Sequence, residues 1–318
     1  MNMLDHRISS RRLDVVGTGF AVLDRVYADG VLSDEALGGS CANVLVSLAM
    51  LGHSVAPVLR LGADDTGARL VQEFVQAGAV VEFISQMDHL RSPILAEEID
   101  TATAAHGFSF RCPITHLELP RYEPIGATEL ADAANAVSGC TVFYADRLTA
   151  EILNAMHFAA RSGAHVIFEP SALDDPNMFA EALNVTTILK TSADRLSDEM
   201  ETVAREAGVS VHIVTHGQSG LELRSPADRL WCPAFLAPTL RDACGAGDMV
   251  TVGLIHGILE RSVANASLTL HDVVDGLVAG QRLAAANCGF DGARGLFRKC
   301  GAAYARALLD GTVVPEPA

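Results

Sequence analysis

The feature that most constrains the fold of this chain is a repeated alternation between short apolar runs and segments of helical periodicity. Apolar residues recur at helical spacing over 41–52, and Gly52 supplies a stop signal. Apolar runs of strand length, such as 55–61 and 165–168, alternate with such segments along much of the chain. Alternation of this kind is typical of parallel strands joined by helices. The sequence therefore predicts an α/β fold with a mostly parallel central sheet.

The expected elements can be assigned by residue range. Strands are predicted at 15–17, 55–61, 80–84, 141–144, 165–168, 187–190 and 211–215, and helices at 41–52, 66–78, 150–162, 178–184, 193–207, 246–260 and 270–288. Two segments, 23–36 and 94–111, instead show short extended runs with polar alternation. They are typical either of a small β-flap over a site or of ordinary surface hairpins. Because no repeat or long linker divides the chain, residues 1–318 are predicted to form a single domain.

Composition excludes several classes of partner. The chain carries 23 Lys and Arg against 39 Asp and Glu, a net charge of −16, which disfavours a nucleic-acid partner. No uncharged apolar run reaches the roughly 18 residues of a membrane span, and the N-terminal segment lacks the apolar stretch of a secretion signal. The seven cysteines show no C-x-x-C spacing and are expected to be reduced thiols. A cytoplasmic protein without a membrane partner is the expectation.

The most informative segment is Asp242–Asp248, which reads DACGAGD and precedes an apolar helix. Small residues let a ligand approach the backbone closely, and the first turn of a helix leaves amide groups unpaired. Together with the helix dipole, these amides form an anion site. A carboxylate at Asp248 would repel a bound phosphate, but it could accept the proton of a hydroxyl that attacks that phosphate. The alternative is a tight turn in which Asp248 only stabilises the helix N-terminus.

A second candidate segment, Gly38–Asn43, precedes the first long helix. The two glycines allow a turn or a close ligand contact. Asn43 offers both a donor and an acceptor to a ligand hydroxyl, and Asp24 is a further candidate for binding such hydroxyls. A capping role for Asn43 and a solvated turn for Asp24 are the structural alternatives.

Taken together and in order, these segments resemble the ribokinase (PfkB) family of carbohydrate kinases. Val15–Asp24 is similar to the opening strand with its downstream acid, and Gly38–Gly52 to the N-terminal signature. Leu61–Gly67 is similar to the family's G-x-D-x-x-G, and Asp242–Asp248 to its D-T-x-G-A-G-D. Val214–Gly220 is similar to the T-x-G-x-x-G on the nucleotide side, and the resemblance extends from residue 14 to about 297.

The resemblance implies a doubly wound, three-layer α/β domain with a small β-lid formed by 23–36 and 94–111. It implies an ATP-dependent kinase that phosphorylates a hydroxyl of a sugar or nucleoside, with Mg²⁺ as cofactor, potassium activation as a further hypothesis, and a homodimer as an expected assembly. It also assigns roles to residues of this chain. These are Asp248 as catalytic base; Gly245, Ala246 and Gly247 in the anion hole; Asp24, Gly39 and Asn43 for the sugar; and Thr215, Gly217, Gly220 and Asn287 for ATP.

Two departures from the family pattern affect these expectations. Ala243 stands where the family has threonine, which removes a hydroxyl and leaves the backbone amides in place. The family's N-x-x-E, which organises magnesium, is altered within 190–195, where Asp194 or Arg195 fills the acidic position. Asp194 is the candidate for an indirect contact with the metal, and Glu169 lies where many members carry Asn or Asp.

Two other functions compete with a kinase. A nucleotide-binding oxidoreductase is suggested by Gly17-Thr18-Gly19, but Val22 occupies the third glycine position and no clear helix follows directly. A non-catalytic sugar or nucleoside sensor on the same fold is the second alternative, because a fold does not determine its function. The intact Asp248 and its small-residue loop favour the kinase, and the sequence leaves the acceptor open.

Overall fold

The computed structural model describes residues 12–100, 105–171, 175–195, 197–261 and 268–315. Part of the predicted lid segment, 101–104, lies outside the described residues, as do 1–11 of the N-terminal segment. Within the described ranges, no helix has both the length and the apolar character needed to cross a membrane.

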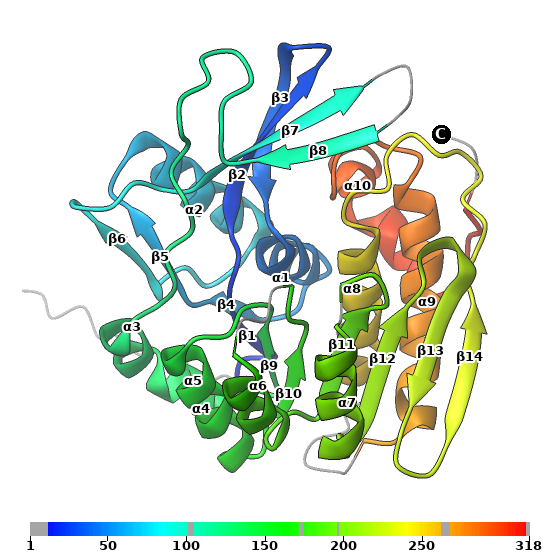
Figure 1. Ribbon diagram of the computed structural model, residues 1–318. Helices are drawn as coiled ribbons and strands as arrows, with labels where there is room; N and C mark the ends of the chain where they lie inside the picture. Colours follow the sequence, from blue (N-terminus) through cyan, green and yellow to red (C-terminus); the bar gives the residue numbers. More distant parts are fainter. Residues whose placement is uncertain (1–11, 101–104, 172–174, 196, 262–267, 316–318) are drawn as a thin grey trace, which may run out of the picture.

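The central sheet has eight strands in the order β14-β13-β12-β11-β10-β9-β1-β4 (Figure 1). All neighbours from β12 to β4 pair in parallel, and β13 and β14 add an antiparallel hairpin at one edge. The strands are β1 Val15–Thr18, β4 Val55–Pro57, β9 Val142–Ala145, β10 His165–Phe168, β11 Ile188–Ser192, β12 Val211–Thr215, β13 Gly220–Arg224 and β14 Arg229–Pro233. This sheet confirms the predicted α/β class with a mostly parallel sheet.

Helices cover both faces of this sheet, because its strand residues point alternately to two separate apolar cores. Val15 and Tyr144 belong to the core under one helix layer, whereas their neighbours Val16 and Phe143 belong to the other core. The first layer contains α1 Ser40–Met50, α8 Ala246–Glu260, α9 Leu270–Asn287 and α10 Gly295–Leu309. The second contains α3 Ala127–Asp132, α4 Ala134–Gly139, α5 Ala150–Arg161, α6 Pro176–Leu183 and α7 Asp198–Ala207. The fold is therefore the expected three-layer, doubly wound arrangement.

A separate four-stranded sheet lies beyond one end of the central sheet, at the top of Figure 1. Its order is β3-β2-β7-β8, from β2 Val22–Ala28, β3 Val31–Gly38, β7 Ile94–Asp100 and β8 Ala105–Ser109. β2 pairs with β7 in parallel and with β3 in antiparallel fashion. The two segments that broke the strand–helix rhythm thus form one small sheet outside the main one, as the lid expectation requires.

Several predicted boundaries were wrong for local reasons. The run 55–61 is two strands in two sheets, because the chain leaves the central sheet after Pro57 and β5 Leu59–Gly62 pairs with β6 Ile84–Met87. That second strand begins at Ile84, where the sequence predicted an end. The helix predicted from 193 begins only at Asp198, because the Ser197 side chain caps it by accepting from the Met200 amide.

Other elements follow the predicted periodicity closely. The helix α2 Asp65–Ala77 ends at Gly78, which adopts the left-handed conformation expected of a stop signal. β10, β12 and α8 have the predicted bounds. Five elements were not predicted from the sequence, namely β13, β14, α3, α4 and α10, and α10 is interrupted by non-helical Gly301.

Candidate active site

Asp248 lies in the first turn of α8, where it is 9% exposed. Its Oδ2 accepts a hydrogen bond of 2.8 Å from Nδ2 of Asn43, which lies in the first turns of α1. Burial and, as the next largest cause, the negative charge of Glu169 raise the pKa of Asp248 to about 7. The Asn43 hydrogen bond and the positive charge of Lys190 act in the opposite direction. The structure thus brings together two residues that are 205 positions apart in the sequence.

The turn before α8 requires glycine at Gly245. This residue is the N-cap of α8 with φ of 71°, and an added Cβ would lie 2.4 Å from the Cβ of Ala293. The carboxylate of Asp242 holds the same turn, because it accepts from the amides of Cys244 (2.6 Å) and Gly292 (2.7 Å). No side chain caps the helix, although the Ala246 amide donates to the Ala243 carbonyl at 3.2 Å. The first-turn amides of Gly247 and Asp248 are therefore better placed than that of Ala246 to donate hydrogen bonds to a bound anion.

A stripe of glycines fixes the position of α8 against α9. A Cβ added at Gly253 would lie 2.3 Å from Cα of Gly280, and one added at Gly257 would lie 2.8 Å from Cα of Gly276. The two helix backbones are consequently in direct contact, with no side chain between them. Because Asp248 lies at the N-terminus of α8, this contact also sets where its carboxylate lies.

A buried cation that was not predicted from the sequence lies beside the turn. Lys190, on β11, is 2% exposed, and its Nζ forms an ion pair with Oε1 of Glu169 at the end of β10. A Cβ built on Gly247 would lie 3.6 Å from this Nζ, so the ammonium group lies next to the proposed anion hole. The useful signal was a lysine inside an otherwise apolar strand, since lysine is almost never fully buried unless it is paired.

Glu169 is held by donors from two further elements. Its Oε2 accepts from Thr251 Oγ1 of α8 at 2.6 Å and from Tyr144 OH of β9 at 3.2 Å. The ion pair with Lys190 is thus part of a network that spans β9, β10, β11 and α8. This network lies beside 190–195, the segment in which the family's N-x-x-E is altered.

A second missed residue, Asp146, directly follows β9 and is fully buried. Its two oxygens accept from the amides of Phe20 (2.8 Å) and Cys41 (3.0 Å). Burial raises the pKa of Asp146 to about 6, although the nearby Arg147 acts against this shift. Asp146 therefore ties the chain after β1 to the start of α1. An acid at the carboxyl end of an apolar strand was the available signal.

Asp24 lies on β2 of the small sheet and lines a cavity of about 700 Å³ together with Glu97 and Arg294. Its Oδ1 is buried and has no hydrogen-bond partner among the residues that the structure describes. Burial, together with the charges of Glu97 and Asp248, raises the pKa of Asp24 to about 8 against the opposing effect of Arg294. Asn43 Oδ1 is likewise buried and accepts no hydrogen bond within the described part of the chain. Two oxygen atoms of the predicted sugar-binding residues are thus available to accept hydrogen bonds from a ligand.

The third predicted sugar residue, Gly39, is the N-cap of α1. It has φ of 88°, and an added Cβ would lie 2.5 Å from the carbonyl oxygen of Phe20. Gly39 therefore allows the sharp entry into the helix that carries Asn43. The neighbouring Gly38 has no room for a side chain, because a Cβ there would lie 1.7 Å from Asp24 Oδ2. The two glycines let the chain turn from β3 into α1 directly beside the Asp24 side chain.

The predicted ATP residues lie at and after the end of β12. Thr215 is the last residue of this strand, and its Oγ1 donates to the Thr191 carbonyl at 3.3 Å. Gly217 and Gly220 both have positive φ, and the ring of His216, which directly precedes Gly217, lies 5.3 Å from the Trp231 ring. These residues form a turn at the carboxyl end of the parallel strands, where open α/β sheets bind ligands.

The other two predicted contacts receive less support from their surroundings. Asn287 is fully buried, and the protein itself uses both ends of its amide: Nδ2 donates to Ala293 O (3.1 Å) and Oδ1 accepts from Leu296 N (3.0 Å). Asp194 is exposed in the turn that follows β11. The adenine contact of Asn287 and the metal contact of Asp194 stay predictions.

The central sheet between two helix layers, the small outer sheet and the buried acid at the start of α8 together define a ribokinase-like α/β protein. Residues 34–297 match the family model described as pfkB family carbohydrate kinase, and the chain belongs to this family. The family resemblance drawn from the sequence motifs is thereby confirmed.

Two relatives show how far sequence similarity extends. The bifunctional protein HldE of Alkalilimnicola ehrlichii is 26% identical over 266 residues, which are 76% of this chain and 52% of that protein. The chain thus spans about half the length of this relative. An ATP-dependent ribose-1-phosphate kinase of Halopiger xanaduensis is 24% identical over 271 residues, covering 77% of this chain and 80% of that protein.

Solved structures show the same fold at low identity. A fructokinase of Xylella fastidiosa with bound ATP has a TM-score of 0.74 at 20% identity, covering 94% of this chain and 98% of that one. The aminoimidazole riboside kinase of Salmonella enterica has a TM-score of 0.72 at 21% identity, with 93% and 100% covered. A fructokinase of Vibrio cholerae bound to fructose, ADP and potassium has a TM-score of 0.69 at 18% identity, with 94% and 99% covered.

Proposed function

We propose that this protein transfers the terminal phosphoryl group of ATP to a hydroxyl of a sugar or nucleoside, with Asp248 as the general base. The observation that carries the proposal is the position of Asp248. It is buried at a glycine-rich helix N-terminus, held by Asn43, and the Lys190 ammonium lies next to its neighbour Gly247. Family membership supports the kinase activity.

The environment of Asp248 suits a base that works near neutral pH. A general base is most effective when its pKa lies close to the operating pH. Burial brings the pKa of this carboxyl to about 7, so a large fraction is ionised at neutrality and still binds a proton well. In the proposed reaction, the acceptor hydroxyl gives its proton to Asp248 as its oxygen bonds to phosphorus, and the bond from phosphorus to ADP breaks.

The phosphate side of the site would be formed by the first-turn amides of α8 and by Lys190. Both bring positive electrostatic potential to one place, which suits the charge of a transferring phosphoryl group. Mg²⁺ is usually bound through phosphate oxygens, retained water and one or two carboxylates. Glu169 would take the carboxylate role, because it lies in the network that touches α8, whereas Asp194 is exposed. When bound, MgATP supplies the phosphoryl group and the metal neutralises part of its charge.

The acceptor would bind between the small sheet and α8. The unpartnered Oδ1 atoms of Asp24 and Asn43 are suited to accept hydrogen bonds from two hydroxyls of one acceptor. The adjoining cavity of about 700 Å³ combines carboxylates with Arg294, and a site of this polarity favours a polyhydroxylated molecule over an apolar one. The named activities of the relatives, on ribose 1-phosphate, fructose and aminoimidazole riboside, fall within this class.

Potassium activation, lid-mediated dimers and a cytoplasmic location complete the proposal. The Asp242 carboxylate and the backbone carbonyls of its turn would hold the potassium ion beside the anion hole. A fructokinase of the same fold was solved with potassium bound. Replacing potassium by tetramethylammonium at constant ionic strength tests this part, and sedimentation of the purified protein tests the dimer.

The function is tested by following ADP release from MgATP with a panel of pentoses, hexoses, sugar phosphates, keto-deoxy acids and nucleosides. Acceptor-dependent turnover with an equimolar phosphorylated product supports the kinase. If the protein binds both ATP and an acceptor without any phosphorylated product, the non-catalytic sensor is correct instead. Measuring binding and turnover on the same preparation separates these outcomes.

A further inference from the structure

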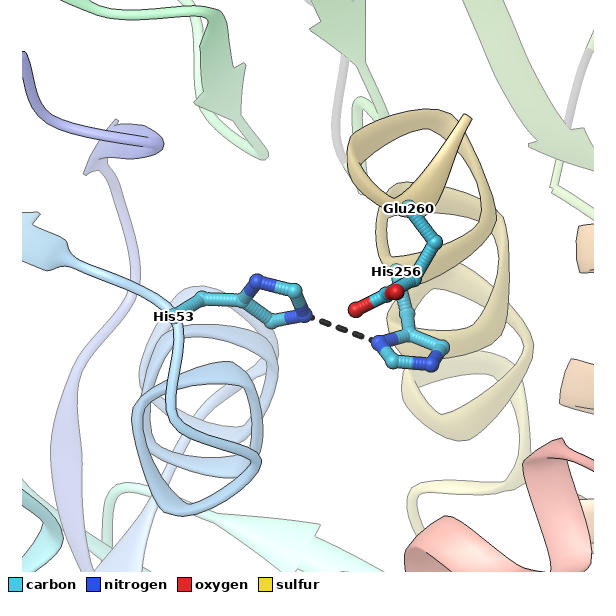
Figure 2. Close-up of side chains that lie close together, drawn as sticks. All are labelled: His53, His256 and Glu260. Atoms are coloured by element: carbon cyan, nitrogen blue, oxygen red, sulfur yellow. Dashed lines mark hydrogen bonds between the residues drawn. The ribbon is translucent and has the colours of Figure 1, made fainter. Parts of the chain in front are cut away.

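A cluster of metal-ligating side chains lies outside the candidate active site. His53 follows the end of α1, and His256 and Glu260 lie one helical turn apart on α8. Figure 2 shows the three side chains pointing toward one another. One ligand atom from each residue lies within 4.8 Å of the other two. Residues four apart on a helix share a face, so His256 and Glu260 act as a chelating pair on one element.

We propose that His53, His256 and Glu260 form a binding site for a divalent transition metal of the zinc type, which would join the end of α1 to α8. Two imidazoles and one carboxylate are a donor set that Zn²⁺ takes in proteins, with water in the remaining position. Softer thiolate ligands are not needed, and hard ions such as Mg²⁺ prefer oxygen donors.

The geometry is close to that of an occupied site. His53 Nε2 and His256 Nδ1 lie 2.8 Å apart and share one hydrogen bond (Figure 2). Two nitrogens bound to one tetrahedral zinc ion would be about 3.3 Å apart, given Zn–N distances of ~2.0–2.1 Å. The rings must therefore separate by about half an ångström, and the shared proton must move to the other nitrogen of the ring that carries it. His53 is only half-buried on a short connection, so this small shift is available.

The surroundings of the cluster also suit a cation. The carboxylate of Glu260 supplies a negative charge beside the two histidine rings. Arg306 is the opposing cation: its Nη1 lies 3.8 Å from Glu260 Oε1, and its Nη2 bonds the Leu51 carbonyl. One Glu260 oxygen thus has an orienting partner, and the exposed carboxylate leaves its other oxygen for the metal.

Direct titration of metal into the intact protein tests the proposal. Protein stripped with a chelator, without nucleotide, is titrated with ZnCl₂ by calorimetry, and with CoCl₂ while the visible absorption of bound cobalt is recorded. The matched control is His157→Ala, because His157 also lies beside a glutamate, with Nε2 3.4 Å from Glu181 Oε1. A second control, Cys300→Ser, removes the exposed cysteine, which could bind zinc on its own.

The expected result is one equivalent of zinc bound with micromolar or tighter Kd, unchanged in both controls and weakened at least tenfold in His53→Ala. Glu260→Gln is a second test, because this residue is exposed and its substitution keeps the hydrogen bond between the histidines. It is expected to weaken zinc binding and to change the cobalt spectrum. Zinc binding that survives both His53→Ala and Glu260→Gln, or no binding at 100 µM (about 100 times a micromolar Kd), would overturn the proposal.

Discussion

The Nδ2 atom of Asn43 lies 2.8 Å from Oδ2 of Asp248, so the carboxylate on α8 is oriented by a residue on α1. The two residues are 205 positions apart in the sequence, so no local pattern predicts this pairing. The hydrogen bond leaves Asn43 Oδ1 free to accept from a ligand. One amide therefore connects the proposed base to the proposed acceptor site, and the following predictions start from this arrangement.

Replacing Asp248 by Asn should reduce kcat by ~10²–10⁴, the usual contribution of a positioned general base. The fold should be kept, because the Asn side chain still accepts from Asn43. The rate of ADP formation with the preferred acceptor measures the effect, and thermal unfolding checks the fold. Asp198→Asn, at an exposed helix N-terminus, is the control with a similar change of charge. A variant of Asp248 with near-normal turnover would remove this residue from the mechanism.

Replacing Asn43 by Ala should move the acidic limb of the pH profile to higher pH. The hydrogen bond from Asn43 lowers the pKa of Asp248, so its loss raises that pKa above about 7 and leaves less ionised base at neutrality. The profile of kcat/KM for MgATP at saturating acceptor is the measurement, since Asp24 is then occupied. Ser47→Ala removes a buried, unpartnered hydroxyl one turn later on α1 and should leave the limb in place. An unmoved limb in Asn43→Ala would contradict the structure.

Substitutions in the Lys190–Glu169 pair should shift the same limb in opposite directions. Lys190 lowers the pKa of Asp248 and Glu169 raises it. Lys190→Met should therefore move the limb to higher pH, and Glu169→Gln should move it to lower pH. Both variants should also lose turnover, but loss alone would not distinguish an electrostatic role from a structural one. Shifts of the same sign in the two variants would be incompatible with the proposed electrostatics.

The Mg²⁺ concentration needed for half-maximal activity should show whether Glu169 or Asp194 helps to bind the metal. Glu169→Gln is expected to raise the Mg²⁺ concentration needed for half-maximal activity by about tenfold, the lower end of the effect of losing an orienting carboxylate. Asp194→Asn should leave that concentration unchanged, because Asp194 is exposed in a turn. Activity measured across a magnesium series at constant free ATP gives both values. The reverse result would restore Asp194 to the role that the resemblance implied.

The glycine contact between α8 and α9 should tolerate no side chain. Gly253→Ala adds a Cβ 2.3 Å from Cα of Gly280 and should destabilise the protein by about 1–3 kcal/mol, the usual cost of overpacking. It should also lower kcat, because α8 carries Asp248. Gly139→Ala is the control, since its Cβ meets nothing within 4 Å and its φ is ordinary. Denaturant unfolding of both variants provides the comparison, and equal stability would argue against a rigid contact.

Sequence patterns predicted the fold class well because buried parallel strands and amphipathic helices leave strong periodic signals. The run 165–168 and the helix 246–260 appear in the structure with the predicted bounds. Where the chain changes sheets within one apolar run, as after Pro57, periodicity contains no signal for the change. Helix α10 escaped prediction because Gly301 interrupts its pattern with a non-helical residue.

The candidate site was predicted where a motif is contiguous and missed where it is assembled from several strands. Asp248, Asn43 and Asp24 were found through short segments that resemble a family. Lys190 and Glu169 lie 21 residues apart on adjacent strands, so only the strand pairing shows that they form an ion pair. Asp146 was missed for the same reason, because its partners Phe20 and Cys41 precede it by more than 100 residues.

Burial raises the pKa of Asp24 to about 8 and that of Asp248 to about 7, and the negative charge of Asp248 adds to the shift at Asp24. Near neutral pH, the free protein therefore holds a fractional number of protons on this pair, shared between a strand of the small sheet and a helix of the main layer. An acceptor that donates hydrogen bonds to both carboxylates favours their ionised forms, so its binding releases protons. Acceptor binding is thus coupled to proton release, so the affinity for the acceptor should rise with pH even without phosphoryl transfer.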